Sequence, residues 1–102
     1  MDLYQQQIVS KCKMEFLKMG AKRQHVDIQD KALLTGRIIE LMGLYELGYS
    51  KELHQLLKDM IEFGERHNLV LAGQRLHFDE LNRRYKVPVH EKQVLWKAEF
   101  TK

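Results

Sequence analysis

The chain is poor in the residues that cross-link or interrupt a fold. Its 102 residues include one cysteine, one proline and six glycines. A single cysteine, Cys12, excludes an intrachain disulfide framework and a zinc site built on cysteines, and it favours a reducing compartment such as the cytoplasm. With Pro88 as the one proline, long loops and many-stranded sheets are hard to build. The absences therefore favour helices.

The sequence also lacks the features that direct a chain to a membrane. No run approaches the roughly 18 uninterrupted apolar residues that a membrane helix needs. The first residues include Asp2 and Gln5 to Gln7 rather than a basic segment followed by an apolar one, so no secretory signal is expected. We therefore expect a cytoplasmic protein without membrane contact.

What is present is the composition of an ordinary globular domain. The chain is 44% hydrophobic and 30% charged, with a formal net charge of +3. This length and this balance predict one helical domain over residues 1–102. The positive charge is compatible with an anionic partner but does not require one.

Three amphipathic helices are predicted in the first two thirds of the chain. The first spans Asp2 to Met19 and is ended by Gly20. The second starts at Asp27 or Asp30, either of which can cap it, and ends at Gly48. The third starts at Ser50, a second capping residue, and ends near Asn68. The apolar positions of the first helix, in steps of three and four residues, are Ile8, Val9, Cys12, Phe16 and Met19.

The second predicted helix is apolar on more than one face. It is therefore either central to the fold or part of an oligomer interface, and Gly43 within it marks close helix packing or a bend. So much apolar surface in a short chain favours self-association or binding to a partner. The residues expected at such an interface are Leu41, Leu44, Tyr45 and Trp96.

The last third of the chain gives a less regular pattern. Leu69 to Ala72 fits a short strand or a continuing helix, Phe78 to Tyr85 fits a short helix ended by Pro88, and residues 91–100 fit a helix or a strand. The fold class predicted is all-α, a small bundle of four to five helices. One short strand or a helix-turn-helix-like unit near the C-terminus is the alternative within it.

No arrangement of residues predicts catalysis or metal binding. The five histidines, at positions 25, 54, 67, 77 and 90, are at least ten residues apart, whereas zinc sites favour close ligand pairs. No nucleophile elbow and no glycine-rich phosphate loop is present. Cys12 lies on an apolar helix face, where a thiol is usually an inert hydrophobe. We expect a non-enzymatic protein with no metal and no cofactor.

A cluster of basic residues is the one candidate for nucleic-acid contact. It consists of Arg75, Arg83, Arg84 and Lys86, with Tyr85 between them. Arginine and lysine side chains supply the sequence-independent part of DNA affinity through the phosphates. The other interpretation is that cations at the end of a helix only complement its dipole.

Several segments resemble the bacterial flagellar master-regulator family, the heteromeric D and C transcriptional activator subunits. Met14 to Leu17, Gly20 to Lys22 and Gly36 to Ile39 look like the N-terminal region of the C subunit. Gln29 to Ala32 and Asn68 to Val70 look more like the D subunit. The resemblance implies a mostly helical dimer that binds a C-type partner and helps to place it on promoter DNA.

The sequence thus predicts a transcriptional regulator or co-regulator that acts through a protein partner and double-stranded DNA, as a homo-oligomer. In this interpretation the basic cluster contacts phosphate. The alternative is a small protein-interaction module, such as a phage- or plasmid-type inhibitor or adaptor, that does not bind nucleic acid.

Overall fold

The protein is described by a computed structural model that covers residues 2–21, 25–69 and 71–87. These residues form four helices: α1 (Leu3–Ala21), α2 (Ile28–Glu46), α3 (Lys51–Arg66) and α4 (Ala72–Arg84). The all-α prediction is confirmed, and no strand occurs among the residues described. Residues 91–100, for which helix and strand were left open, and Pro88 lie outside them.

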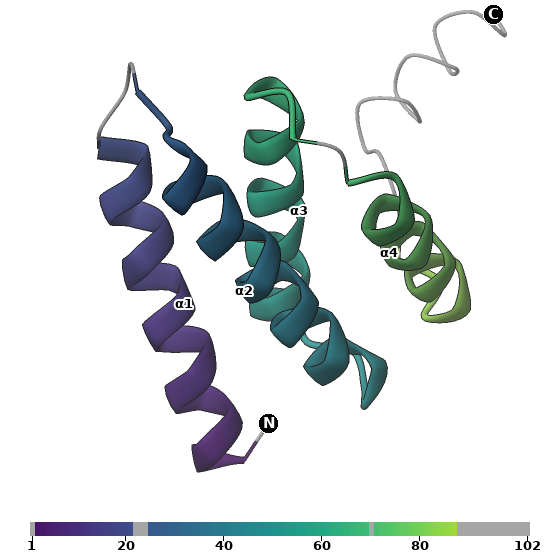
Figure 1. The fold of residues 1–102 in the computed structure, drawn as a ribbon. Coiled ribbons are helices and arrows are strands. Elements are labelled where there is room, and N and C mark those ends of the chain that lie inside the picture. Colours follow the sequence, from purple (N-terminus) through teal and green to yellow (C-terminus); the bar gives the residue numbers. More distant parts are fainter. Residues whose placement is uncertain (1, 22–24, 70, 88–102) are drawn as a thin grey trace, which may run out of the picture.

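The helix α2 is central to the bundle, as its apolar residues on several faces allowed. It packs against each of the other three helices, and α1 and α4 lie on opposite sides of the α2–α3 pair (Figure 1). One continuous apolar core joins all four helices. The density of apolar residues in α2 therefore follows from its having three neighbours within the chain.

Side-chain caps fix where α2 and α3 begin. The Asp27 carboxylate accepts the backbone N–H of Asp30 at 2.8 Å, and the Asp30 carboxylate accepts that of Asp27 at 3.3 Å. This reciprocal pair satisfies two donors that a helix start leaves free. Ser50 accepts the backbone N–H of Leu53 at 3.3 Å, which confirms it as the cap of α3.

The helices α3 and α4 both end in a Schellman motif. Asn68 and Lys86 adopt left-handed backbone conformations, with φ of 62° and 56°. After each, the next N–H bonds back to a carbonyl in the last turn: Leu69 to Gly64 at 2.9 Å, and Val87 to Asn82 at 3.0 Å. These bonds end the two helices without the help of glycine or of Pro88.

Two details of the sequence prediction are corrected by the structure. The helix α1 continues through Gly20 to Ala21. The helix predicted over Phe78 to Tyr85 starts six residues earlier, at Ala72. Of the strand and the continuing helix left open for Leu69 to Ala72, no strand is found at the three of these residues that the structure describes. The early start of α4 was missed because its first turn carries no side-chain cap and no acidic residue, the usual signals of a helix start.

Close helix packing occurs at Gly64 rather than at Gly43. A Cβ added to Gly64 would lie 2.7 Å from Leu71 Cδ1 and 3.3 Å from Leu34 Cδ2. Gly64 therefore lets the start of α4 and the start of α2 approach α3 closely. No atom lies within 4 Å of a Cβ placed on Gly43, so the prediction of close packing at Gly43 is wrong.

Candidate functional site

A shallow hollow of about 330 Å³ lies between α2 and α4. Its walls are mostly apolar. From α2 they comprise Ile39, Met42, Gly43 and Glu46, and from α4 they comprise Gly73, Gln74 and His77. Met42 is only 4% exposed and belongs to the core, whereas Ile39 is 53% exposed. The hollow therefore joins the core to an apolar residue at the surface.

The hollow owes its space to two glycines that the fold does not require. Neither Gly43 nor Gly73 has any atom within 4 Å of an added Cβ, and neither has a positive φ. A glycine in a helix interior, as at Gly43, destabilises the helix by about 1 kcal/mol relative to alanine. Both glycines line the hollow, so its walls lack a side chain at two positions where the surrounding space would accept one.

A polar contact connects the two walls of the hollow. The carboxylate of Glu46, at the end of α2, lies 2.7 Å from Nε2 of His77 in α4. Both side chains are well exposed, so this contact adds little to stability. It does place a carboxylate and an imidazole at a hollow whose walls are mostly apolar.

A buried polar network fixes α4 against α2 and α3. The Tyr45 hydroxyl donates to Asn82 Oδ1 at 2.6 Å, and His54 Nδ1 lies 3.2 Å from both oxygens. Tyr45 and Asn82 are almost completely buried. Each helix supplies one group, so the network holds only when all three helices are in register.

The electrostatics of this network keep its groups neutral. Burial raises the pKa of Tyr45 to about 12, so the hydroxyl keeps the proton that it donates. Burial also lowers the pKa of His54, and the bond to Asn82 opposes this only in part. Among the residues described, no buried side-chain oxygen or nitrogen lacks a hydrogen-bond partner.

Aromatic packing surrounds the same network. Tyr45 packs edge-on against Tyr85 with ring centroids 5.2 Å apart, and the His54 ring stacks on Phe78 at 5.3 Å. The Tyr85 hydroxyl donates to the Tyr45 carbonyl. These contacts are directional, so α4 has one defined orientation and the hollow has a defined shape.

The structure places the four residues of the predicted basic cluster in two settings. Arg75 is bonded to both Glu65 carboxylate oxygens, at 3.2 and 2.7 Å, and it lies 3.8 Å from Asp79. Arg83 and Arg84 in the last turn of α4, and Lys86 after it, are exposed. These three have no ion pair within the part of the chain that the structure describes. They remain candidates for phosphate contact, whereas the charge of Arg75 is already compensated.

The residues predicted at an exposed interface are mostly elsewhere. Leu41 and Tyr45 have no exposed surface, so the expectation that they form an exposed apolar face is wrong: both belong to the core, where His54 of α3 and Phe78 of α4 pack against Tyr45. Leu44 is partly buried against the core. Trp96 lies outside the described residues.

The one cysteine of the chain, Cys12, is buried and is not activated as a nucleophile. Burial and the nearby Glu40 carboxylate raise the pKa of the Cys12 thiol to about 11, so it is protonated and a poor nucleophile at neutral pH. No three histidine, cysteine or carboxylate side chains of the described residues are grouped closely enough to hold a metal ion. Within those residues no helix has both the length and the apolar character to cross a membrane.

Sequence reasoning missed the hollow itself. Its walls come from residues about thirty positions apart, and no local motif connects them. The one available signal was Gly43, a glycine inside a strongly helical pattern. Comparison of the chain with family models, curated proteins and solved structures finds no match, so its function is argued from its own geometry.

Proposed function

We propose that the protein is a non-enzymatic interaction module that binds a protein partner at the hollow between α2 and α4. The observation that carries this proposal is that Gly43 and Gly73 hold open an apolar space that stability alone would fill. A single apolar side chain of the partner would fit into it, with Ile39 packing beside it. Insertion of one side chain into a rigid pocket is the usual form of an interface hot spot.

The contacts around the hollow support this function. The buried Tyr45–His54–Asn82 network fixes the distance between its walls, so the pocket exists before the partner arrives. A pocket formed in advance avoids the ordering cost of binding. At the edge of the hollow, Glu46 offers the partner a carboxylate acceptor and His77 offers a ring nitrogen.

Two leucine substitutions in the same helix test the proposal. Gly43→Leu fills the hollow, whereas Gly36→Leu adds the same side chain at another position with no atom within 4 Å of its Cβ. The tagged variants are used for affinity capture from the native lysate, with and without nuclease. A protein partner that wild type and Gly36→Leu recover, but Gly43→Leu does not, supports the proposal. Equal recovery by both variants contradicts it.

A second candidate function is supported by the exposed cations at the end of α4. We propose that Arg83, Arg84 and Lys86 contact the phosphates of double-stranded DNA, so that the module serves a transcriptional regulator or co-regulator. The resemblance of several segments to flagellar master-regulator subunits, which act as dimers, supports the same function. The hollow would then bind the protein through which it acts.

The DNA contact is tested by its salt dependence. Replacing Arg83 and Arg84 with alanine should weaken DNA binding and reduce the slope of log affinity against log salt by about one to two. Arg75→Ala is the matched control, because its guanidinium is held by Glu65 and its loss should leave the slope nearly unchanged. Equal slopes for wild type and the Arg83, Arg84 variant would contradict the proposed contact with DNA phosphates.

A further inference from the structure

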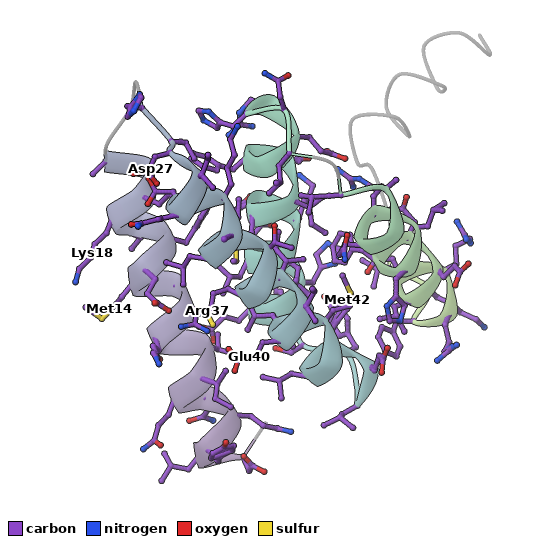
Figure 2. All side chains as sticks on the ribbon, in the orientation of Figure 1. Met14, Lys18, Asp27, Arg37, Glu40 and Met42 are labelled. Carbon is purple, nitrogen blue, oxygen red and sulfur yellow. The ribbon has the colours of Figure 1, made fainter. Side chains whose placement is uncertain are left out.

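The helix α1 carries a second apolar face that no other described part of the chain covers. Leu3, Met14 and Leu17 are 69%, 60% and 61% exposed. On a helix with 3.6 residues per turn, Leu3 and Met14 lie on the side opposite the buried Cys12, and Leu17 lies beside them. In Figure 2, Met14 and Lys18 project from the side of α1 that faces away from α2, whereas Arg37 and Glu40 lie on its α2 side.

The spacing of this outer face is that of a helix-pairing seam. The exposed Leu3, Met14 and Leu17 fall on one set of positions separated by alternating steps of four and three residues, the a and d positions of a coiled coil, and the polar Gln7 and Ser10 occupy two positions between them. The positions in register are Leu3, Gln7, Ser10, Met14, Leu17 and Ala21. A straight partner helix could therefore follow α1 over about 28 Å.

The charge beside this seam is of one sign. Lys11 and Lys18 flank it on one side and Lys13 on the other, and all three are exposed. The only carboxylate within α1 is Glu15, and both of its oxygens bond to Arg37 of α2, at 2.7 and 3.3 Å. Glu15 also attracts Lys11 and Lys18, so one carboxylate, already bonded to Arg37, faces three lysines and the surface keeps a net positive charge.

We infer that the outer face of α1 binds an acidic amphipathic helix of a protein partner. Leucine-like residues of that helix would cover Leu3, Met14 and Leu17, and its carboxylates would lie beside the three lysines. The hollow lies between α2 and α4, and α1 and α4 are on opposite sides of the α2–α3 pair (Figure 1), so the inference is independent of the function proposed above.

Two other occupants fit the face less well. A second copy of α1 would bring lysines against lysines, and like charges at these positions oppose pairing. An anionic lipid surface would attract the lysines, but the exposed apolar residues of this face form a narrow stripe, whereas a helix lying in a membrane surface buries a broad apolar face.

The experiment measures binding of the full chain to a designed peptide by fluorescence anisotropy. The peptide has three heptads with leucine at a and d and glutamate at e and g; its control has lysine at e and g. The wild-type chain should bind the acidic peptide, and it should bind about tenfold more weakly when salt rises from about 50 to about 300 mM. It should not bind the basic peptide.

Two α1 variants and one matched control locate the binding. Replacing Met14 and Leu17 with glutamine should weaken binding about tenfold or more, and circular dichroism checks that the fold is kept. The charge variant replaces Lys11, Lys13 and Lys18 with glutamine and should bind weakly and without salt dependence. The control removes the same net charge elsewhere by replacing Lys31, Lys51 and Arg66 with glutamine, and it should bind like wild type.

Four results would overturn the inference. The first is no binding of the acidic peptide by wild type, and the second is equal binding by the α1 variants. The third is a wild-type dimer in sedimentation equilibrium that the Met14, Leu17 variant dissociates, which would assign the face to a second copy. The fourth is that the α1 variants lose more of their binding to vesicles of phosphatidylglycerol and phosphatidylcholine than of their binding to the peptide. That result would assign the outer face of α1 to lipid.

Discussion

The two outer helices of the bundle are attached to the α2–α3 pair in different ways. The helix α1 is held by an apolar stripe that includes Val9, Cys12 and Met19, with one ion pair at its edge. The helix α4 is held by a buried polar network and by aromatic contacts. Apolar packing is tolerant of small shifts, whereas hydrogen bonds between buried groups fix one geometry. The helix with the fixed geometry is the one that borders the hollow.

The largest loss of stability should come from a change at the α4 junction, the contacts that hold α4 against α2 and α3. Its shared hydrogen-bond acceptor is Asn82 Oδ1, which Tyr45 and His54 both contact. Asn82→Ala leaves the buried Tyr45 hydroxyl and His54 Nδ1 without Oδ1, so unfolding should require about 2–3 kcal/mol less free energy. Urea denaturation measures it. Glu80→Ala, on the exposed side of the same helix, should change stability by less than about 0.5 kcal/mol. Similar values for both variants would show that the network does not hold α4.

Alanine substitution should change the stability in opposite directions at Gly43, which lines the hollow, and at Gly64, which lies where α3 is closely packed. Gly43→Ala should stabilise the protein by about 1 kcal/mol, because the added methyl meets no atom and helix propensity improves. Gly64→Ala should destabilise it by about 1 kcal/mol or more, because the methyl overlaps the buried Leu71 side chain. Thermal unfolding of both variants gives the signs. Destabilisation by Gly43→Ala would mean that the hollow is not open.

The contacts of α4 and those of α1 with the α2–α3 pair should also lose stability in different pH ranges. Burial lowers the pKa of His54 below its ordinary 6.5, so the folded state resists a proton that the unfolded chain accepts. The α4 junction therefore contributes fully above about pH 6.5, and its contribution falls as the pH drops below that. The bond to Arg37 lowers the pKa of Glu15 below 4.5, so the α1 ion pair contributes above about pH 4.5 and is lost only as the pH falls further.

Urea denaturation at about pH 7.5, 5.5 and 4 separates these contributions. The decrease in stability between the first two values should shrink in His54→Gln, and it should be unchanged in Glu15→Gln. An equal decrease in wild type and His54→Gln would contradict the assignment of this transition to His54.

The smallest effect should come from the ion pair at the α1 junction. Arg37 and Glu15 are each about a quarter exposed, so water and salt screen their attraction. A double-mutant cycle with Arg37→Gln and Glu15→Gln should give a coupling energy of about 0.5–1 kcal/mol, decreasing at high salt. A coupling above about 2 kcal/mol would mean that α1 is held as specifically as α4.

The parts of the fold that the sequence predicted are those set by local patterns. The third predicted amphipathic helix is α3, and its six buried residues, Leu53, Leu56, Leu57, Met60, Ile61 and Gly64, share one face, because a helix with one apolar face has only one way to turn toward a core. The caps at Asp27 and Ser50 are likewise local, since each side chain bonds a backbone group three residues away.

The parts that the sequence did not predict depend on contacts between distant residues. Because α2 is apolar on several sides, its sequence could not show that α3 and α4 cover Leu41 and Tyr45. The hollow and the Tyr45–His54–Asn82 network each need residues from helices that meet only in the folded chain. The exposed and compensated members of the basic cluster were equally indistinguishable, because Glu65, which holds Arg75, lies in another helix.

We propose above that the contacts holding α4 keep a partner-binding hollow open between α2 and α4. The most direct test maps the amide chemical shifts of the isotope-labelled chain as the protein recovered by affinity capture is added. The largest changes in amide shift should occur at Ile39 to Glu46 in α2 and at Gly73 to His77 in α4. Shifts that leave both segments unchanged while residues elsewhere respond would contradict the proposal.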